Sequence, residues 1–312
     1  MTGLVQVDGL RIVFDGRLRA VDGVSFDLTE GETLGLVGES GSGKTTIAKA
    51  LLGLYTPTEG QVTFDGRVLA GLKRRERMWF RRQAQIIFQD AYSSLSPRLT
   101  IRSLLTEPLR IHGLDPRAEF HRIEALMAAV NLSPVLLDKY PHQISGGQAR
   151  RVGIARALVL HPRLVVADEP TAGLDVSIQG DLLNLLADLR REYGLTYLMV
   201  SHNLNVIRKV TDRVAVLYLG RIMEIGTTRQ VFMAPRHPYT HALLAANPEI
   251  DPALRRTKVV LQGEIPSPMN PPPGCRFHTR CPRAQSRCRA EPPELRTLGG
   301  QSFACHFPLE TP

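Results

Sequence analysis

The segment that most constrains the fold is a glycine-rich stretch near the start of the chain, Gly38-Glu-Ser-Gly-Ser-Gly-Lys-Thr45. It follows a short apolar run at 33–37 with strand composition and precedes a helix of small and aliphatic residues at 45–54. A polyphosphate-binding loop requires this context, because glycines let successive N–H groups and a helix N-terminus point at negative charge. We therefore expect an α/β core built around a nucleotide site.

The side chains of this loop have distinct expected roles. Lys44 adds a point charge at the β and γ phosphates, and the Thr45 hydroxyl can ligate Mg²⁺. The predicted nucleotide-binding set from this loop is Gly38, Ser40, Gly41, Ser42, Gly43, Lys44, Thr45 and Thr46. The alternative is a glycine-rich turn without a ligand, and the motifs that follow in the chain weigh against it.

Two adjacent carboxylates end a second apolar strand, Leu164-Val-Val-Ala-Asp168-Glu169. Burying unpaired carboxylates is costly, so an interior strand ends this way when an ion or a reacting water receives them. We expect Asp168 to belong to the Mg²⁺ shell and Glu169 to be the base that orients the attacking water. The alternative is an exposed strand end.

The rest of the chain has the pattern of a sheet-forming core with a helical insertion. Strand composition occurs at 4–14, 21–28, 61–64, 84–88, 164–167, 196–200, 213–218 and 221–225. Helical patterns occupy 72–82 and most of 100–157. Seven prolines between 247 and 273 indicate a semi-rigid linker, because proline can neither continue a helix nor donate to a sheet.

Composition narrows the function classes. The chain has 312 residues, 43% of them hydrophobic and 22% charged, which is ordinary for a globular protein. It contains neither the run of about 18 apolar residues of a membrane-spanning helix nor a signal-peptide pattern at its start, so we expect it to be neither integral to a membrane nor exported. The net charge of +9 is spread along the chain apart from one cluster at 73–82, which is typical of a solvated surface, and no nucleic-acid partner is expected.

A third motif makes the chain similar to a known family. Ser145-Gly-Gly-Gln148, followed by Val-Gly-Ile-Ala-Arg-Ala-Leu, resembles the signature sequence of ATP-binding cassette (ABC) ATPases. The resemblance covers residues 4 to about 245. Other family motifs stand in the same order: Gln89 resembles the Q-loop, Ala172-Gly-Leu-Asp175 the D-loop and His202 the switch histidine.

The resemblance implies a fold and roles. It implies an α/β, P-loop ABC ATPase core with an antiparallel β subdomain, a helical subdomain at about 90–160 and a small cysteine-containing C-terminal extension. Gln89 would be a Mg²⁺ ligand and, with Glu169 and His202, part of the catalytic set. Phe14 would stack on adenine, the alternative being a core phenylalanine. The signature residues of one domain would complete the γ-phosphate site of a second, through Ser145, Gly146, Gly147 and Gln148.

Within the family, the chain looks like the ATPase subunits of oligopeptide, dipeptide and nickel importers, and more like the second of their two paired ATPases. Three segments carry the likeness to the importers: Phe88-Gln-Asp-Ala-Tyr-Ser-Ser-Leu-Ser-Pro-Arg98, His237-Pro-Tyr-Thr240 and the proline-rich lead into Gly274-Cys-Arg-Phe. The likeness to the second ATPase rests on the form Tyr92-Ser-Ser-Leu. The resemblance implies a Mg²⁺-dependent ATPase that energises import of peptides or similar solutes.

The same resemblance implies partners and a location. The partners would be a second ABC ATPase in a heterodimer, two transmembrane permease subunits and, indirectly, an extracytoplasmic substrate-binding protein, all engaged from the cytoplasmic face of the membrane. Residues 90–100 would meet the permease. The alternative function is a soluble ABC ATPase acting on ribosomes or nucleic acid, and a third is a redox-sensing binding module. Departures from the usual family pattern are Ala91, Ala149, Ala172-Gly173 and Asn203.

The predicted domain organisation is a nucleotide-binding domain at 1–245, a proline-rich linker at 246–273 and a four-cysteine segment at 274–312. The four cysteines are Cys275, Cys281, Cys288 and Cys305. Because such a short segment is expected to lack a core of its own, we predict a metal staple. Cysteine pairs with the close spacing of zinc sites are missing, and the Cys-x-Phe-x-x-Arg-Cys-Pro pattern resembles importer ATPases that carry a 4Fe-4S cluster. Zinc and free thiols are the alternatives.

Overall fold

The computed structural model describes residues 3–247, 261 and 263–310. The chain divides into two compact units. The first unit combines the residues up to Ala70 with those from Met199 onward, and the second unit is Gly71–Leu198. Of the predicted proline-rich linker at 246–273, residues 248–260 and 262 lie outside the described residues.

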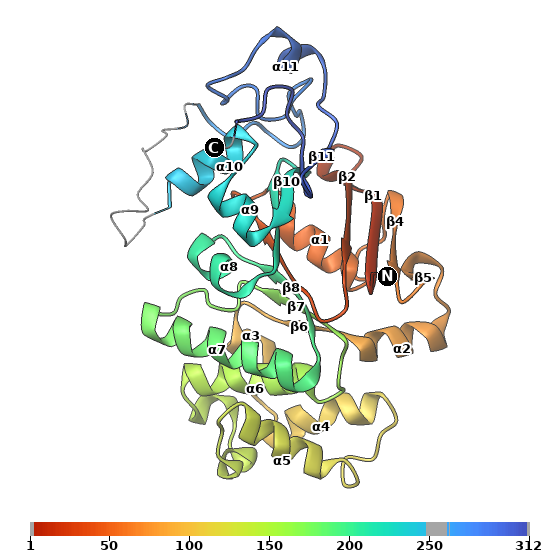
Figure 1. The fold of residues 1–312 in the computed structure, drawn as a ribbon. Coiled ribbons are helices and arrows are strands. Elements are labelled where there is room, and N and C mark those ends of the chain that lie inside the picture. The colour runs from red at the N-terminus through yellow and green to blue at the C-terminus, as the bar shows by residue number, and fades with distance from the viewer. Residues whose placement is uncertain (1–2, 248–260, 262, 311–312) are drawn as a thin grey trace. The chain divides into compact units, whose positions relative to one another are not determined.

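The first unit contains an antiparallel sheet with the strand order β2-β1-β4-β5 (Figure 1). Its strands are β1 (Val5–Phe14), β2 (Leu18–Leu28), β4 (Glu59–Phe64) and β5 (Arg67–Val68). Side chains alternate along β1, where Val5, Val7, Leu10 and Ile12 are buried. This sheet matches the antiparallel subdomain that the resemblance implies.

A second group of strands in this unit surrounds β3 (Thr33–Val37), whose five residues are all buried. β3 pairs in parallel with β9 (Arg213–Tyr218), which pairs antiparallel with β10 (Arg221–Thr227). A C-terminal hairpin, β11 (Arg296–Leu298) and β12 (Gln301–Phe303), continues this group because β12 pairs with β10. The helices of the unit are α1 (Lys44–Leu51), α8 (Leu204–Val210), α9 (Thr228–Met233), α10 (Pro238–Ala245) and α11 (Ser286–Ala290).

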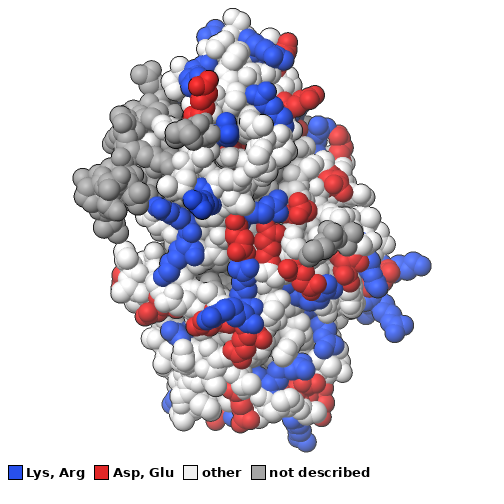
Figure 2. Space-filling view, viewed as in Figure 1, with Lys and Arg blue, Asp and Glu red and all other residues white. Residues whose placement is uncertain are grey.

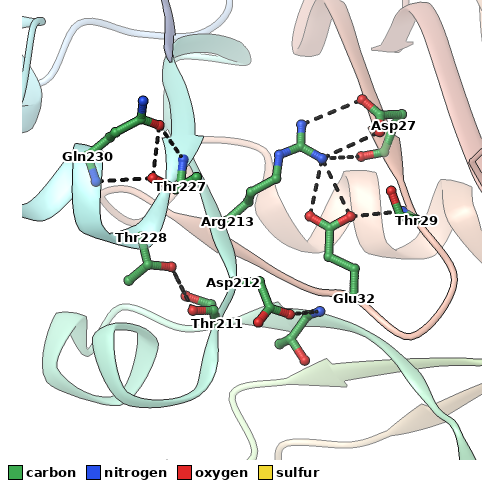
Figure 3. Close-up of polar contacts among 10 residues, drawn as sticks. Asp27, Thr29, Glu32, Thr211, Asp212, Arg213, Thr227, Thr228 and Gln230 are labelled. Atoms are coloured by element: carbon green, nitrogen blue, oxygen red, sulfur yellow. Dashed lines mark hydrogen bonds and ion pairs between the residues drawn. The ribbon is translucent and has the colours of Figure 1, made fainter. Parts of the chain in front are cut away.

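Polar contacts fasten the two strand groups of the first unit to each other (Figure 3). Arg213, at the start of β9, donates to the Glu32 carboxylate at 3.1 Å and forms an ion pair with Asp27 at the end of β2. Glu32 in turn accepts the N–H of Thr29 at 2.8 Å. These contacts fix the turn that leads into β3, and β3 is the strand that delivers the glycine-rich loop.

The second unit combines two parallel strands with a set of helices. β6 (Ala84–Ile87) pairs in parallel with β7 (Leu164–Asp168), and β8 (Thr196–Val200) carries the chain into the first unit. The α-helices are α2 (Arg74–Gln83), α3 (Ala91–Ser94), α4 (Ile101–Ile111), α5 (Phe120–Ala129), α6 (Gly146–Leu158) and α7 (Val176–Tyr193). Short 3₁₀ turns lie at Pro134–Asp138 and Pro141–Gln143, and the chain enters this unit within a further 3₁₀ turn at Leu69–Gly71. The expected fold class, an α/β core with an antiparallel sheet and a helical segment, is confirmed.

Within the described part of the chain, no helix has both the length and the apolar character needed to cross a bilayer. On the faces visible in Figure 2, Lys and Arg side chains are interspersed with Asp and Glu side chains. The visible surface therefore has mixed charge, as expected for a solvated face.

Candidate active site

The glycine-rich loop leaves β3 and enters α1 directly, as the sequence predicts. Gly38 has a φ of 150°, and a Cβ on it would lie 2.2 Å from the carbonyl oxygen of Leu217, so only glycine fits. Gly43 has a φ of 103°, and its Cβ would lie 2.4 Å from the carbonyl oxygen of Ala20. The loop is therefore pressed against β2 and the end of β9, and this close approach fixes its path.

The start of α1 is arranged to receive an anion. Its N-cap, Gly43, offers no side-chain oxygen, and the first turn contains no acidic residue. The first N–H groups of a helix lack partners inside the helix, and the helix dipole favours negative charge there. Lys44 is buried and donates from Nζ to the carbonyl oxygens of Gly38 at 2.8 Å and Glu39 at 3.0 Å. The ammonium group thus lies within the curve of the loop.

His202 is brought to the same region of the first unit. The N–H of Ser201 donates to the carbonyl oxygen of Leu36 in β3 at 3.3 Å, so the segment after β8 runs beside the strand that ends in the loop. His202 is exposed, and Asn203 caps α8 by accepting the N–H groups of Asn205 and Val206. The amide at position 203, where the family has an acidic residue, thus serves as a helix cap.

Phe14 lies at the end of β1 and is partly exposed. Its ring meets Tyr55 edge to face, with the centroids 5.2 Å apart. The Lys49 ammonium lies 5.4 Å from the centroid of the Tyr55 ring. Phe14 is thus not a fully buried core residue, and its adenine-stacking role stays a prediction.

In the second unit, one sheet edge brings together Gln89 and the two carboxylates. β6 and β7 are parallel and pair Ile87 with Ala167, so the residues after both strands emerge at the same edge. Gln89 follows β6, while Asp168 ends β7 and Glu169 comes next. Glu169 has a φ of 48°, which is the left-handed region that non-glycine residues rarely adopt. Such backbone strain is concentrated at functional sites.

The signature residues form the exposed start of α6. Ser145 is the N-cap: its hydroxyl accepts the N–H of Gln148 at 3.2 Å, and the Gln148 side chain accepts the N–H of Ser145 at 3.0 Å. This is a capping box, which a Ser-x-x-Gln spacing produces at a helix start. Gly146 and Gly147 are exposed, and nothing lies within 4 Å of a Cβ placed on Gly147. An anion therefore has access to the N–H groups here.

One residue of this site was not singled out from the sequence. Arg150, in the second turn of α6, donates to the carbonyl oxygens of Pro170 at 3.0 Å and Ala172 at 3.1 Å. It therefore ties the signature helix to the segment that follows Glu169. The sequence signal was weak, because a single arginine in an arginine-rich helix does not reveal its partners.

The prediction of a metal cluster in the C-terminal segment is wrong. Across residues 3–247, 261 and 263–310, no group of three or more His, Cys, Asp or Glu side chains could hold a metal ion. The predicted 4Fe-4S ligands Cys275, Cys281, Cys288 and Cys305 are free cysteines, and the zinc alternative lacks a site among the same residues. Burial raises the pKa of Cys275 to about 11 and that of Cys305 to about 12, so both side chains are neutral thiols at neutral pH.

The C-terminal segment needs no metal for its stability because it shares the core of the first unit. β12 joins the strand group of the first unit through β10, and Phe277 and Phe303 are fully buried in that unit. The two halves of the segment are also bonded directly, because the N–H of Cys275 donates to the carbonyl oxygen of Cys288 at 2.8 Å. Packing shared with the first unit therefore stabilises this segment without a metal.

Comparison with known proteins supports the assignment of these motifs. The family described as "ABC transporter" matches residues 21–172, and the "Oligopeptide/dipeptide transporter, C-terminal region" matches 223–288. The oligopeptide transport ATP-binding protein AppF of Bacillus subtilis is 47% identical over 94% of this chain and 90% of its own length. A Brucella ovis protein described as a peptide import ATP-binding protein is 50% identical over 97% of this chain and 98% of its own.

Solved structures agree with the fold. CbiO1 of Clostridium perfringens, part of an ABC transporter complex, has a TM-score of 0.69 and 27% identity, covering 75% of this chain and 92% of its own. The ATP-binding cassette MJ0796, in a dimer bound to ADP and Pi, has a TM-score of 0.64 and 30% identity, covering 72% and 99%. The chain therefore belongs to the ABC transporter ATPases, in the branch that carries the oligopeptide and dipeptide transporter C-terminal region.

Proposed function

We propose that this chain binds and hydrolyses Mg²⁺-ATP to energise the import of peptides or similar small solutes through a membrane permease. The observation that carries the proposal is the loop from Gly38 to Thr46, in which the Lys44 ammonium donates to the loop's own carbonyl oxygens and α1 starts without a side-chain cap. The names of the relatives support peptides as the cargo.

The oxygen donors near the motifs suit Mg²⁺, which prefers hard oxygen ligands. In the first unit the Thr45 hydroxyl is a proposed Mg²⁺ ligand, and in the second unit the Gln89 amide oxygen and the Asp168 carboxylate are proposed Mg²⁺ ligands. A Mg²⁺ ion held there would supply positive charge that offsets the charge of the phosphate groups during phosphoryl transfer. The protein groups then position the nucleotide, with Phe14 against the adenine and the backbone of the loop around the phosphates.

Hydrolysis requires a group that orients water. We assign this role to Glu169, which directly follows β7 and has a left-handed backbone conformation. In the first unit, His202 would hold the γ-phosphate and the water. Gln89 would link the ion to the permease-facing segment that follows it. These roles amount to positioning and electrostatic stabilisation, which is how phosphoryl transfer is catalysed in this class of enzyme.

The signature residues are suited to bind the nucleotide that a second subunit holds. Ser145, Gly146 and Gly147 are exposed at the start of a 13-residue helix, and such a helix start binds phosphate. We propose that they complete the γ-phosphate site of a similar ATPase in a head-to-tail heterodimer. Copurification of the permeases with two copies of this chain, and no second ATPase, would overturn the heterodimer.

The remaining partners follow from the proposed import activity. Two permease subunits would be contacted at the cytoplasmic face of the membrane, through the segment from Tyr92 to Pro97. Phe88 and Tyr92 are 50% and 45% exposed, which supports a contact surface there. A substrate-binding protein outside the cytoplasm would deliver the cargo to the permeases. The domain limits that we propose are 1–245 for the nucleotide-binding domain and 274–312 for the C-terminal segment.

The experiment that tests the proposal is Glu169→Gln in the full chain. We expect ATP affinity to be retained and hydrolysis to fall by roughly 10²–10⁴-fold, the usual contribution of a general base. ATP should also stabilise a dimer that size-exclusion chromatography detects. Glu124→Gln is a matched control, because Glu124 is exposed on α5 in the same unit. A Glu169→Gln chain as active as wild type would exclude the base assignment.

The alternative function on ribosomes or nucleic acid is disfavoured. The relatives found are transport proteins, and the second family match is a transporter C-terminal region. Uptake of a labelled peptide by cells that contain the permeases separates the two functions. Loss of uptake in the Glu169→Gln strain supports import, whereas cosedimentation with ribosomes that nuclease abolishes supports the alternative.

A further inference from the structure

The glycine-rich loop has a contact that the nucleotide motifs do not explain. Glu39, the second residue of the loop, forms an ion pair with Arg280 in the cysteine-containing segment. Arg280 donates from Nη1 to one carboxylate oxygen at 2.7 Å and from Nη2 to the other at 3.1 Å. Bidentate pairs of this kind fix geometry as well as supplying energy. The two residues are 241 positions apart, and both belong to the first unit.

The pair is shielded from solvent. The Arg280 side chain is 8% exposed and that of Glu39 is 23% exposed. Solvent screens an ion pair less at such a site than on an open surface. Removal of one partner would leave the other charge poorly solvated, so this pair should resist displacement more than an exposed pair does.

Backbone contacts join Glu39 to the phosphate-binding lysine. The carbonyl oxygen of Glu39 accepts from Lys44 Nζ at 3.0 Å. The backbone N–H of Glu39 donates to the Tyr239 hydroxyl at 3.1 Å. Glu39 is therefore held on three sides, by Arg280, Tyr239 and Lys44. A shift of its backbone would move both a loop peptide and the ammonium group.

Arg280 is itself held in place by aromatic packing. The guanidinium of Arg280 lies 5.9 Å from the Tyr218 ring centroid. The backbone N–H of Arg280 donates to the carbonyl oxygen of Phe277 at 3.0 Å. Phe277 is fully buried, and its ring centroid lies 5.4 Å from that of Tyr218 and 5.2 Å from that of Tyr239. The arginine is thus preorganised, so it loses little freedom when it binds the loop.

We propose that Arg280 is a positioning residue for ATP: it holds Glu39, and through it the first turn of the phosphate-binding loop, so that the C-terminal segment sets the affinity of the loop for ATP. This inference rests on the proposed ATP-binding role of the loop. It assigns the cysteine-containing segment a role in nucleotide binding that requires neither a metal nor an electron partner.

The test measures the Kd for ATP and the melting temperature of the full chain. Arg280→Ala should raise the Kd about tenfold, the order expected for loss of a charge-assisted hydrogen bond. In the assembled transporter the KM for ATP should rise in the same proportion, with kcat unchanged. The matched control is Arg287→Ala, which removes a 2.8 Å ion pair with Glu291 on the exposed side of the same segment and should leave the Kd unchanged.

A double-mutant cycle separates positioning from general stability. Glu39→Ala, which removes both acceptor oxygens, should also raise the Kd. Adding Arg280→Ala to it should change the Kd no further, because residues that act through one contact are not additive. If Arg280→Ala fails to fold, Glu39→Ala still breaks the pair from the loop side, and an unchanged Kd in Glu39→Ala would then overturn the proposal.

Lys44→Ala distinguishes failure of this inference from failure of the proposed function. If Lys44→Ala loses ATP binding while Arg280→Ala binds ATP like wild type, the positioning role is wrong and the ATP site stands. If Lys44→Ala itself binds ATP like wild type, the proposed site is wrong, and the inference falls with it. A lower melting temperature in Arg280→Ala without a change in Kd would show that the pair is merely structural.

Discussion

The hydroxyl of Tyr92 donates a 2.7 Å hydrogen bond to the carbonyl oxygen of Ile144, the residue before the signature serine. The ring is also close to the signature, because a Cβ on Gly146 would lie 3.6 Å from Tyr92 Cε2. Tyr92 belongs to the segment that we propose meets the permease. One side chain therefore connects that segment to the signature, within the second unit.

This contact predicts that Tyr92→Phe weakens the coupling between the proposed permease-facing segment and ATP hydrolysis. The variant keeps the ring and loses a hydrogen bond that contributes about 1 kcal/mol, which corresponds to roughly a fivefold effect. We expect about fivefold slower ATP hydrolysis in the assembled transporter, while the Kd for ATP of the isolated chain is unchanged. Tyr193→Phe, at the end of α7, is the control. Equal hydrolysis rates in wild type and Tyr92→Phe would show that the hydroxyl has no part in coupling.

A second prediction concerns the close approach of Gly38 to Leu217. In Gly38→Ala the new Cβ would meet a backbone oxygen at 2.2 Å, at a φ of 150° that L residues avoid. Since that oxygen belongs to β9, the loop must move away from the strand. We expect a loss of about 1–3 kcal/mol in the free energy of unfolding, together with weaker ATP binding. Urea denaturation and ATP titration measure the two effects.

The control for Gly38→Ala is Gly180→Ala, which we expect to change the free energy of unfolding in the opposite direction. Gly180 lies inside α7, and nothing stands within 4 Å of a Cβ placed on it. Alanine is a better helix former than glycine, so Gly180→Ala should raise the free energy of unfolding by about 0.5–1 kcal/mol. A loss of stability in Gly180→Ala would mean that the glycine has a role beyond the helix backbone.

The nucleotide motifs could be predicted from the sequence because each is contiguous. The loop around Lys44 and the acids at Asp168 and Glu169 are short strings whose neighbours indicate strand or helix. The chemistry of these motifs depends mainly on the local backbone, so the sequence alone is enough to predict them. The Ser145 capping box is equally local, since a Ser-x-x-Gln spacing defines it.

The contacts of the C-terminal segment could not be predicted, because they join distant residues. Nothing in the pattern around Arg280 indicates Glu39 as its partner. The strands β11 and β12 have three residues each, too few for a clear sequence pattern, and β12 extends the sheet by pairing with β10. The cysteine spacing predicts a ligand set only if the segment lacks a core. Phe277 and Phe303 instead pack into the core of the first unit.

The last prediction uses the buried histidine at the start of α10. His237 is 1% exposed, and its Nδ1 accepts the N–H of Tyr239 at 3.0 Å, so it caps the helix as a neutral ring. Burial lowers its pKa from the ordinary 6.5 to about 3. Between these values the unfolded chain binds a proton that the folded chain does not, so the free energy of unfolding falls as the pH falls below 6.5.

We therefore compare urea unfolding of wild type and His237→Asn at pH 7.5 and pH 5.5. Asparagine can cap the helix but does not titrate. The histidine should cost wild type about 1.4 kcal/mol between the two pH values, and the variant should lack this component of the pH dependence. The comparison uses the change with pH within each protein, so the packing defect of the smaller side chain cancels. The same pH dependence in both proteins would show that His237 is already protonated in the folded chain, because the ring would then not release its proton on folding.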